Sequence, residues 1–242
     1  MIRSGGRTRR MVRLAAALLV ALAASAGGAD RPAGAASLRV MALGDSLTAG
    51  AGSSHRAGYR LTFWKRLQEE GLEVDMVGGK ADGPETIDNR HQGYSPGALH
   101  EISAAAYDKV RHYEPDVVLV LAGTDEWRED RFSAPSFAVN LGVLIDRIFT
   151  ARPSATVFVA TIPPPKFGRH EQEKRQVNRL LRREVQERAG RGQAVHLVDV
   201  YELLDPTRDM LDGNRPNDAG YEKIGDAFAD AVLAVRGTDA PE

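Results

Sequence analysis

From residue 37 onward, short apolar runs alternate with longer segments in which apolar residues recur every three or four positions. Runs of the first kind are typical of strands buried on both faces, and segments of the second kind are typical of helices with one face packed inward. Predicted strands cover residues 38–43, 73–77, 116–121, 156–160 and 194–198. Predicted helices cover residues 59–70, 99–113, 136–151, 171–189 and 218–235.

This alternation predicts an α/β fold with three layers, in which a five-stranded, mostly parallel sheet carries helices on both faces. Ligands of such sheets bind beyond the carboxyl ends of the strands. Four loops that open at this edge lie around Ser46, Gly93, Gly123 and Asp212. We therefore expect one domain over residues 37–236, with its site in these loops, followed by a tail at 237–242.

The N-terminal segment has the pattern of a processing signal. Five arginines precede the apolar stretch 14–24, and small residues follow it. The stretch is shorter than the roughly 20 residues that a membrane-spanning helix needs. We interpret residues 1–36 as a signal peptide with a short linker, which predicts a secreted or extracytoplasmic protein without stable membrane insertion after cleavage. An uncleaved membrane anchor is the alternative.

Composition narrows the chemistry. The formal net charge is -1, with 32 basic and 33 acidic residues, so nothing in the charge balance indicates a nucleic-acid partner. The chain has no cysteine, which excludes disulfides and thiolate catalysis. No two of the six histidines have HExxH spacing. We expect no metal and no other cofactor.

A candidate nucleophile follows the first predicted strand, in Gly44-Asp45-Ser46-Leu47. This stretch resembles the signature of the SGNH (GDSL) hydrolase family, and three later blocks that resemble the family's occur in the same order. They lie at 91–97, 123–126 and 212–221. The resemblance implies a flavodoxin-like fold and a serine hydrolase that cleaves carboxylic esters, with acyl or acetyl groups on a glycan or lipid as the expected substrates.

The resemblance also assigns roles to individual residues. Ser46 is the nucleophile, and its backbone N–H forms the oxyanion hole together with that of Gly93. Asp212 orients the catalytic base. For Gly93 the alternative is a turn residue that requires a positive φ.

Two positions depart from the family pattern. The family's oxyanion Asn is replaced by Asp125, and an ionised carboxylate donates no hydrogen bond to a developing oxyanion. The family's catalytic His is replaced by Arg215, which stays protonated and accepts no proton from a serine. We expect Asp125 and Arg215 to face one pocket and to compensate each other's charge, with Asp212 also near Arg215. The alternative is that both point to solvent.

Another histidine is a possible substitute base. His91 lies two residues before Gly93 and is the first candidate, and His55, in the loop after Ser46, is the second. Two functions follow from these residues. The first is an exported ester hydrolase whose ordinary activity is impaired or lost. The second is a non-catalytic protein with the same fold that binds an acyl, carbohydrate or anionic ligand.

Overall fold

The predicted α/β class is confirmed by a computed structural model, which describes residues 37–126, 133–168 and 170–238. The strands of these residues are β1 (Leu38–Gly44), β2 (Val74–Met76), β3 (Lys80–Ala81), β4 (Arg90–Gly93), β5 (Val117–Leu121), β6 (Thr156–Ala160) and β7 (Val195–Val198). Their helices are α1 (Arg60–Glu69), α2 (Leu99–Tyr113), α3 (Ala134–Ala151), α4 (Glu171–Gly190), α5 (Val200–Leu203) and α6 (Asp218–Thr238).

The strands form one sheet in the order β3-β4-β1-β5-β6-β7. All its pairs are parallel except β3 with β4. β2 pairs with the first half of β1, and β4 pairs with its end, where Gly44 lies opposite Gly93. All five predicted strands form, but β3 and β4 were missed because residues 78–96 are polar and rich in glycine. A short polar strand has no hydrophobic pattern to reveal it.

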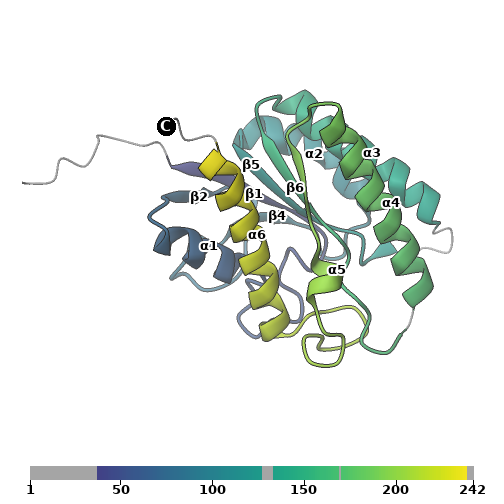
Figure 1. Ribbon diagram of the computed structural model, residues 1–242. Helices are drawn as coiled ribbons and strands as arrows, with labels where there is room; N and C mark the ends of the chain where they lie inside the picture. Colours follow the sequence, from purple (N-terminus) through teal and green to yellow (C-terminus); the bar gives the residue numbers. More distant parts are fainter. Residues whose placement is uncertain (1–36, 127–132, 169, 239–242) are drawn as a thin grey trace, which may run out of the picture. The chain divides into compact units, whose positions relative to one another are not determined.

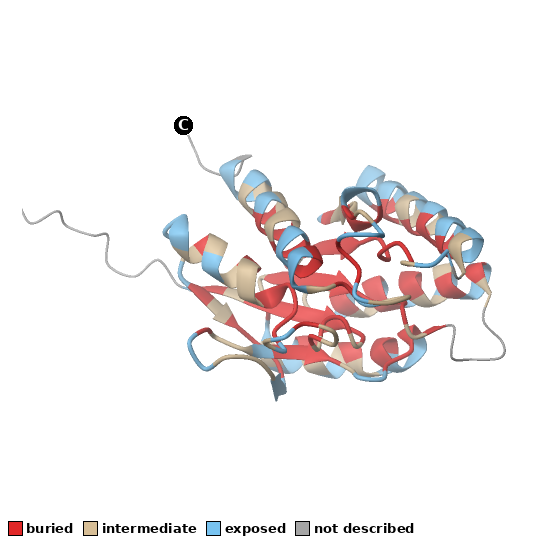
Figure 2. Ribbon diagram, turned by 90° about the horizontal axis from the view of Figure 1, so that it is seen from below, coloured by how far each residue is buried: buried red, intermediate tan, exposed pale blue. Residues whose placement is uncertain are grey.

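Helices cover both faces of the sheet (Figure 1). α2, α3 and α4 pack on one face, and α1 and α6 pack on the other. The central strands β1, β5 and β6 between them are buried almost throughout (Figure 2), whereas both residues of the edge strand β3 are exposed. β1 shows the period of two that a central strand requires, because Met41 and Leu43 enter one core and Val40 and Ala42 enter the other.

The predicted helices form with small differences at their ends, and α6 continues to Thr238, two residues into the predicted tail. The short α5 directly follows β7 and was not predicted. The predicted signal peptide at 1–36 lies outside the described residues. Among the described helices, none is both long and apolar enough to cross a bilayer.

Two glycines allow the strand ends to approach closely. A Cβ on Gly44 would lie 1.9 Å from the carbonyl oxygen of Leu121 in β5, and a Cβ on Gly93 would lie 2.5 Å from the backbone nitrogen of Ala49. The first contact fixes the end of β1 against β5, and the second fixes β4 against the turn that carries Ser46. Gly93 is not among the residues with positive φ, so close approach is the reason for glycine at this position.

Candidate functional site

Ser46 lies in a tight turn directly after β1. The turn is closed by the bonds Ala49 N to Asp45 O (3.1 Å) and Ala51 N to Ser46 O (2.9 Å). The Thr48 hydroxyl donates to the carbonyl of Leu121 at 3.0 Å, which fastens the turn to β5. The Ser46 N–H has no acceptor among the described residues, so it is free to donate to a ligand. Ser46 itself is half-buried.

The fully buried carboxylate of Asp45 joins this turn to the loop after β5. One oxygen accepts from the N–H of Leu47 at 2.9 Å. The other accepts from the N–H of Gly123 (2.9 Å) and from the N–H and hydroxyl of Thr124 (both 2.7 Å). Burial raises the pKa of Asp45 to about 6, and the negative charge of Asp125 adds to the shift. Asp45 is therefore a structural anchor, because one of its four hydrogen bonds holds the Ser46 turn and the other three set the position of Thr124 and hence of Asp125.

Asp125 faces the nucleophile. Its Oδ1 lies 3.5 Å from the Ser46 Oγ, and its Oδ2 accepts from the N–H of Gly97 at 3.0 Å. Within the described residues, the Ser46 hydroxyl therefore contacts the carboxylate of Asp125. At 3.5 Å this is a weak hydrogen bond. A carboxylate at this place opposes any negative charge that develops on a bound acyl group.

Arg215 is bound to Asp212. Its Nε donates to Asp212 Oδ2 at 2.7 Å, and its backbone N–H donates to Asp212 Oδ1 at 2.9 Å. Partial burial raises the pKa of Asp212, but the hydrogen bonds from Arg215 and Asn214 outweigh it, so the pKa lies below its usual range. The stem of Arg215 packs on the loop after Ser46, since a Cβ on Gly52 would lie 2.9 Å from the Arg215 Cβ.

The expected pair between Asp125 and Arg215 does not form. Among the described residues the carboxylate partner of Arg215 is Asp212, and Asp125 contacts Ser46 and Gly97. The mutual compensation that we expected is therefore wrong. The physical reason is local, because Asp212 lies three residues before Arg215 in the same turn and receives both its backbone and its side-chain donors.

His91 is buried and bound away from Ser46. Its Nε2 lies 3.2 Å from Asp82 Oδ2, and its Nδ1 accepts the N–H of Gly93 at 3.0 Å. Burial lowers the pKa of His91 to about 4, and the charge of Arg60 adds to the shift, so the ring is neutral at pH 7. This geometry does not bring His91 to Ser46 as a base. It also occupies the Gly93 N–H, the second donor expected for the oxyanion hole.

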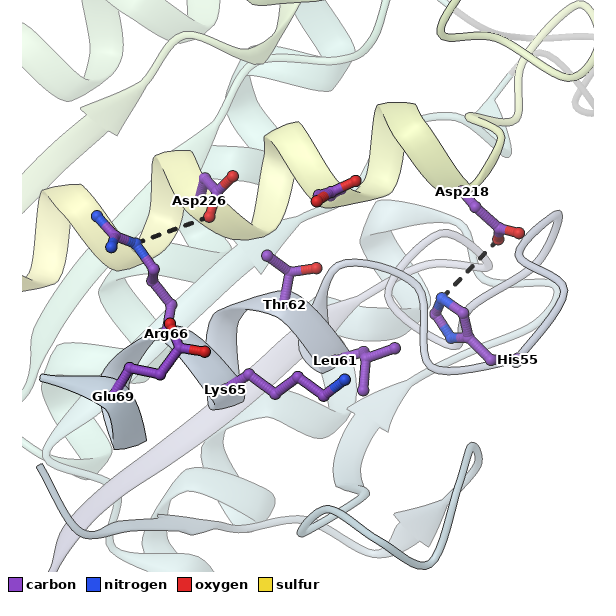
Figure 3. Close-up of a pocket in the computed structure, with 9 residues that line it drawn as sticks. His55, Leu61, Thr62, Lys65, Arg66, Glu69, Asp218 and Asp226 are labelled. Carbon is purple, nitrogen blue, oxygen red and sulfur yellow. Dashed lines mark ion pairs between the residues drawn. The ribbon is translucent and has the colours of Figure 1, made fainter. Parts of the chain in front are cut away.

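His55 does not reach Ser46 either. Figure 3 shows it in a groove of about 370 Å³ between α1 and α6, where its ring faces Asp218 at 3.8 Å. The Nδ1 of His55 accepts the N–H of Ala57 at 3.2 Å. The Nδ1 of His55 is therefore occupied, and its Nε2 faces a carboxylate in a groove that is lined by charged side chains of both signs.

A second hollow, of about 340 Å³, opens beside the Ser46 turn. Its lining consists of the loop Ala49–Ser53 together with Arg56, Asp82 and Ser95. Arg56 Nη2 donates to Asp82 Oδ1 at 2.9 Å, so the two charges at its wall are paired. This polar hollow, whose wall also includes Ser53 and Ser95, carries no net charge from these two groups.

Two buried cations near the site were missed by sequence reasoning. Lys174 donates to the carbonyl of Pro163 at 3.2 Å, and burial lowers its pKa to about 8 while the charges of Glu171, Asp45 and Asp212 oppose the shift. The other cation is Arg60, at the start of α1. The sequence pattern could have revealed both cations, because each occupies a position on the apolar face of its helix. Arg60, for example, shares this face of α1 with Phe63 and Leu67.

The described residues contain no group of three or more histidine or acidic side chains that could hold a metal ion. At the carboxyl edge of the sheet, the site consists of Ser46 in the turn after β1, its free backbone N–H, and the nearby carboxylates of Asp45 and Asp125. This arrangement defines the class as an α/β protein with a hydrolase-type serine site.

Comparison with known proteins gives the family. A profile of the GDSL-like lipase/acylhydrolase family matches residues 42–223, and the chain belongs to this family. The match includes the Ser46 turn and extends through the loop that contains Arg215.

Two curated relatives and two solved structures are similar to the chain. A multidomain esterase of Ruminococcus flavefaciens is 24% identical over 237 residues, which is 86% of this chain and 30% of that protein. Putative endoglucanase X of Acetivibrio thermocellus is 28% identical over 151 residues, which is 60% of this chain and 64% of that protein. The chain thus spans less than two thirds of the length of either relative.

The family 3 carbohydrate esterase of Clostridium thermocellum superposes with a TM-score of 0.75 at 28% identity, covering 85% of this chain and all of that one. A carbohydrate esterase of family 3 from Talaromyces cellulolyticus has a TM-score of 0.73 at 24% identity, covering 84% of this chain and 100% of that one. At 24% identity, the similarity to the structure from Talaromyces cellulolyticus shows the fold alone.

Proposed function

We propose that this chain is an exported member of the family that binds an esterified carbohydrate and whose ordinary ester hydrolysis is impaired or lost. The observation that carries the proposal is the pair of Arg215 with Asp212. In the family pattern a histidine in place of Arg215 would accept the serine proton, and a protonated guanidinium accepts none. A serine without an adjacent base is a weak nucleophile at neutral pH.

The oxyanion side of the site is weakened as well. The Ser46 N–H is the donor that remains, while the Gly93 N–H is donated to His91. Asp125 places a negative charge beside the Ser46 Oγ, where the family supplies the amide donor of an asparagine. Loss of one such donor in well-studied hydrolases costs about 2.7–4 kcal/mol of transition-state stabilisation. Binding of an ester needs neither the base nor this stabilisation.

The ligand class is inferred from two observations. The structure from Clostridium thermocellum that resembles this chain is a carbohydrate esterase. The polar hollow beside the Ser46 turn has room for a hydroxyl-bearing group next to the acyl position. Export is inferred from the basic and apolar pattern of residues 1–36, which supports a cleaved signal peptide.

The test is turnover of p-nitrophenyl acetate by the purified protein beside its Ser46→Ala variant. We expect the wild-type rate to lie within about threefold of the variant's rate, because Ser46 lacks a base that would activate it. A wild-type rate that exceeds the Ser46→Ala rate by 100-fold or more would establish ordinary catalysis at Ser46 and refute the impairment. Circular dichroism of both proteins confirms that they are folded.

A further inference from the structure

We infer that Arg60 is a positioning residue, which holds the Ser46 turn and the segment leading to Gly93 in fixed relation to each other. The inference rests on the proposed function insofar as these two segments form the ligand site. The hydrogen bonds of Arg60 itself are independent of whether the site turns over an ester.

The guanidinium of Arg60 is fully buried and binds four backbone carbonyls. Its Nε donates to Thr48 O at 3.0 Å, and its Nη1 donates to Asn89 O at 2.7 Å. Its Nη2 donates to Arg56 O at 3.2 Å and to Asp82 O at 2.9 Å. One side chain therefore binds oxygens from two separate stretches of backbone, residues 48–56 and 82–89.

These oxygens belong to the backbone that builds the site. Thr48 is two residues after Ser46 in the nucleophile turn. Asn89 immediately precedes β4, whose last residue is Gly93. Arg56 and Asp82 line the polar hollow beside this turn. Arg60 thus lies beneath the site and joins the walls of the hollow to the turn and to β4.

The contacts of Arg60 extend to the Gly93 amide through Asp82. The backbone of Asp82 is held by Arg60, while its carboxylate binds His91 Nε2 at 3.2 Å. The Nδ1 of His91 in turn accepts the Gly93 N–H at 3.0 Å. A shift of Asp82 would therefore move the His91 ring, and with it the end of β4 that this ring holds through the Gly93 amide. In this role His91 is a second positioning residue.

A buried cation is an expensive way to pack a helix. Taking a guanidinium out of water costs free energy that neutral carbonyls repay only in part, and burial lowers the pKa of Arg60 to about 10. The helix α1 already has Phe63 and Leu67 to anchor it in the core. The placement of Arg60 is explained by the loops that it joins, because a hydrophobic side chain would remove the donors of four buried or partly buried hydrogen bonds to carbonyl oxygens.

The test compares Arg60→Met and Arg60→Lys with a control on the same helix, Arg66→Met. Arg66 is partly exposed and pairs with Asp230 at 3.1 Å on α6.

The readout is amide hydrogen exchange of the otherwise wild-type protein. It is followed in two peptides near the site, 47–58 and 82–93, and in one core peptide, 144–160. We expect exchange in the first two segments to be at least 10-fold faster in Arg60→Met, with 144–160 unchanged. Arg60→Lys keeps the positive charge but lacks the several N–H groups of a guanidinium, so we expect its exchange rates in these two segments to lie between those of the wild type and Arg60→Met. Arg66→Met is expected to match the wild type.

Equal acceleration in all three segments would reveal a general loss of stability and would overturn the positioning role. Unchanged exchange at 47–58 and 82–93 would overturn it as well.

A second experiment measures kinetics in a protein that turns over p-nitrophenyl acetate, which is either the wild type or its Asp125→Asn/Arg215→His variant. There Arg60→Met is expected to lower kcat by about 100-fold with KM within threefold, since misplacement by about 1 Å has such effects. An unchanged kcat would contradict the inference. An active wild type would refute the proposed impairment and leave the exchange result for Arg60 unaffected.

Discussion

Replacing Asp125 by Asn together with Arg215 by His is expected to raise the turnover of p-nitrophenyl acetate by about 1,000-fold or more over the wild-type protein. A positioned general base contributes roughly 10²–10⁴-fold, and an oxyanion donor contributes about 10²–10³-fold. The structure is prepared for both changes. Asp212 already accepts from the backbone and side chain at position 215, so it is placed to orient a histidine there. Asp125 already lies 3.5 Å from the Ser46 Oγ.

One of the two single substitutions and a third change serve as controls for this gain. Asp125→Asn alone is expected to raise turnover little, because Ser46 still lacks a base, and residues that act as a unit are strongly non-additive. Adding Ser46→Ala to the double variant is expected to remove the gain. A double variant no faster than the wild type, although folded, would mean that more than these two positions separates this site from an active one.

Asp45→Ala is expected to lower the free energy of unfolding by about 4 kcal/mol or more. Asp45 is fully buried, and its carboxylate accepts from three backbone N–H groups and one hydroxyl. The alanine leaves these donors unsatisfied in the interior, and each buried unsatisfied group costs about 1–3 kcal/mol. The variant no longer buries a carboxylate, and the desolvation cost that is avoided in this way offsets part of the loss. Urea denaturation followed by circular dichroism measures the change.

A matched control for this substitution is Asp75→Ala. Asp75 pairs with Arg39 at 2.9 Å on a partly exposed surface, where ion pairs contribute about 0–1 kcal/mol. We expect a loss within that range for the control. A loss below about 1 kcal/mol for Asp45→Ala as well would show that Asp45 does not anchor the loop that carries Asp125.

The parts of the fold with a strong hydrophobic pattern could be predicted from the sequence. β5 is a continuous apolar run that is buried along its whole length, and α2 was predicted with its observed bounds. β4 could not be predicted in this way. Its residues Arg90 to Gly93 are polar or small, and they form a strand because the end of β1 offers a pairing edge to them.

The candidate site could be located from the sequence but its contacts could not be derived. The loops around Ser46, Asp125 and Gly93 do meet at one edge of the sheet. The choice of Asp212 over Asp125 as the partner of Arg215 depends on how a short turn directs its donors. The binding of His91 to Gly93 likewise depends on a buried ring geometry. Such choices between nearby partners are set by packing, which a sequence pattern does not encode.

The central claim is that Ser46 is not activated in the wild-type protein, and covalent labelling of the serine measures this most directly. A fluorophosphonate probe reacts rapidly with a serine whose proton is accepted by a neighbouring base. The protein is incubated with the probe, and the label at Ser46 is quantified by peptide mass spectrometry, with the Asp125→Asn/Arg215→His variant alongside. We predict no labelling of Ser46 in the wild type above that of heat-denatured protein, and ready labelling in the variant. Rapid, stoichiometric labelling of Ser46 in the wild type would contradict the account.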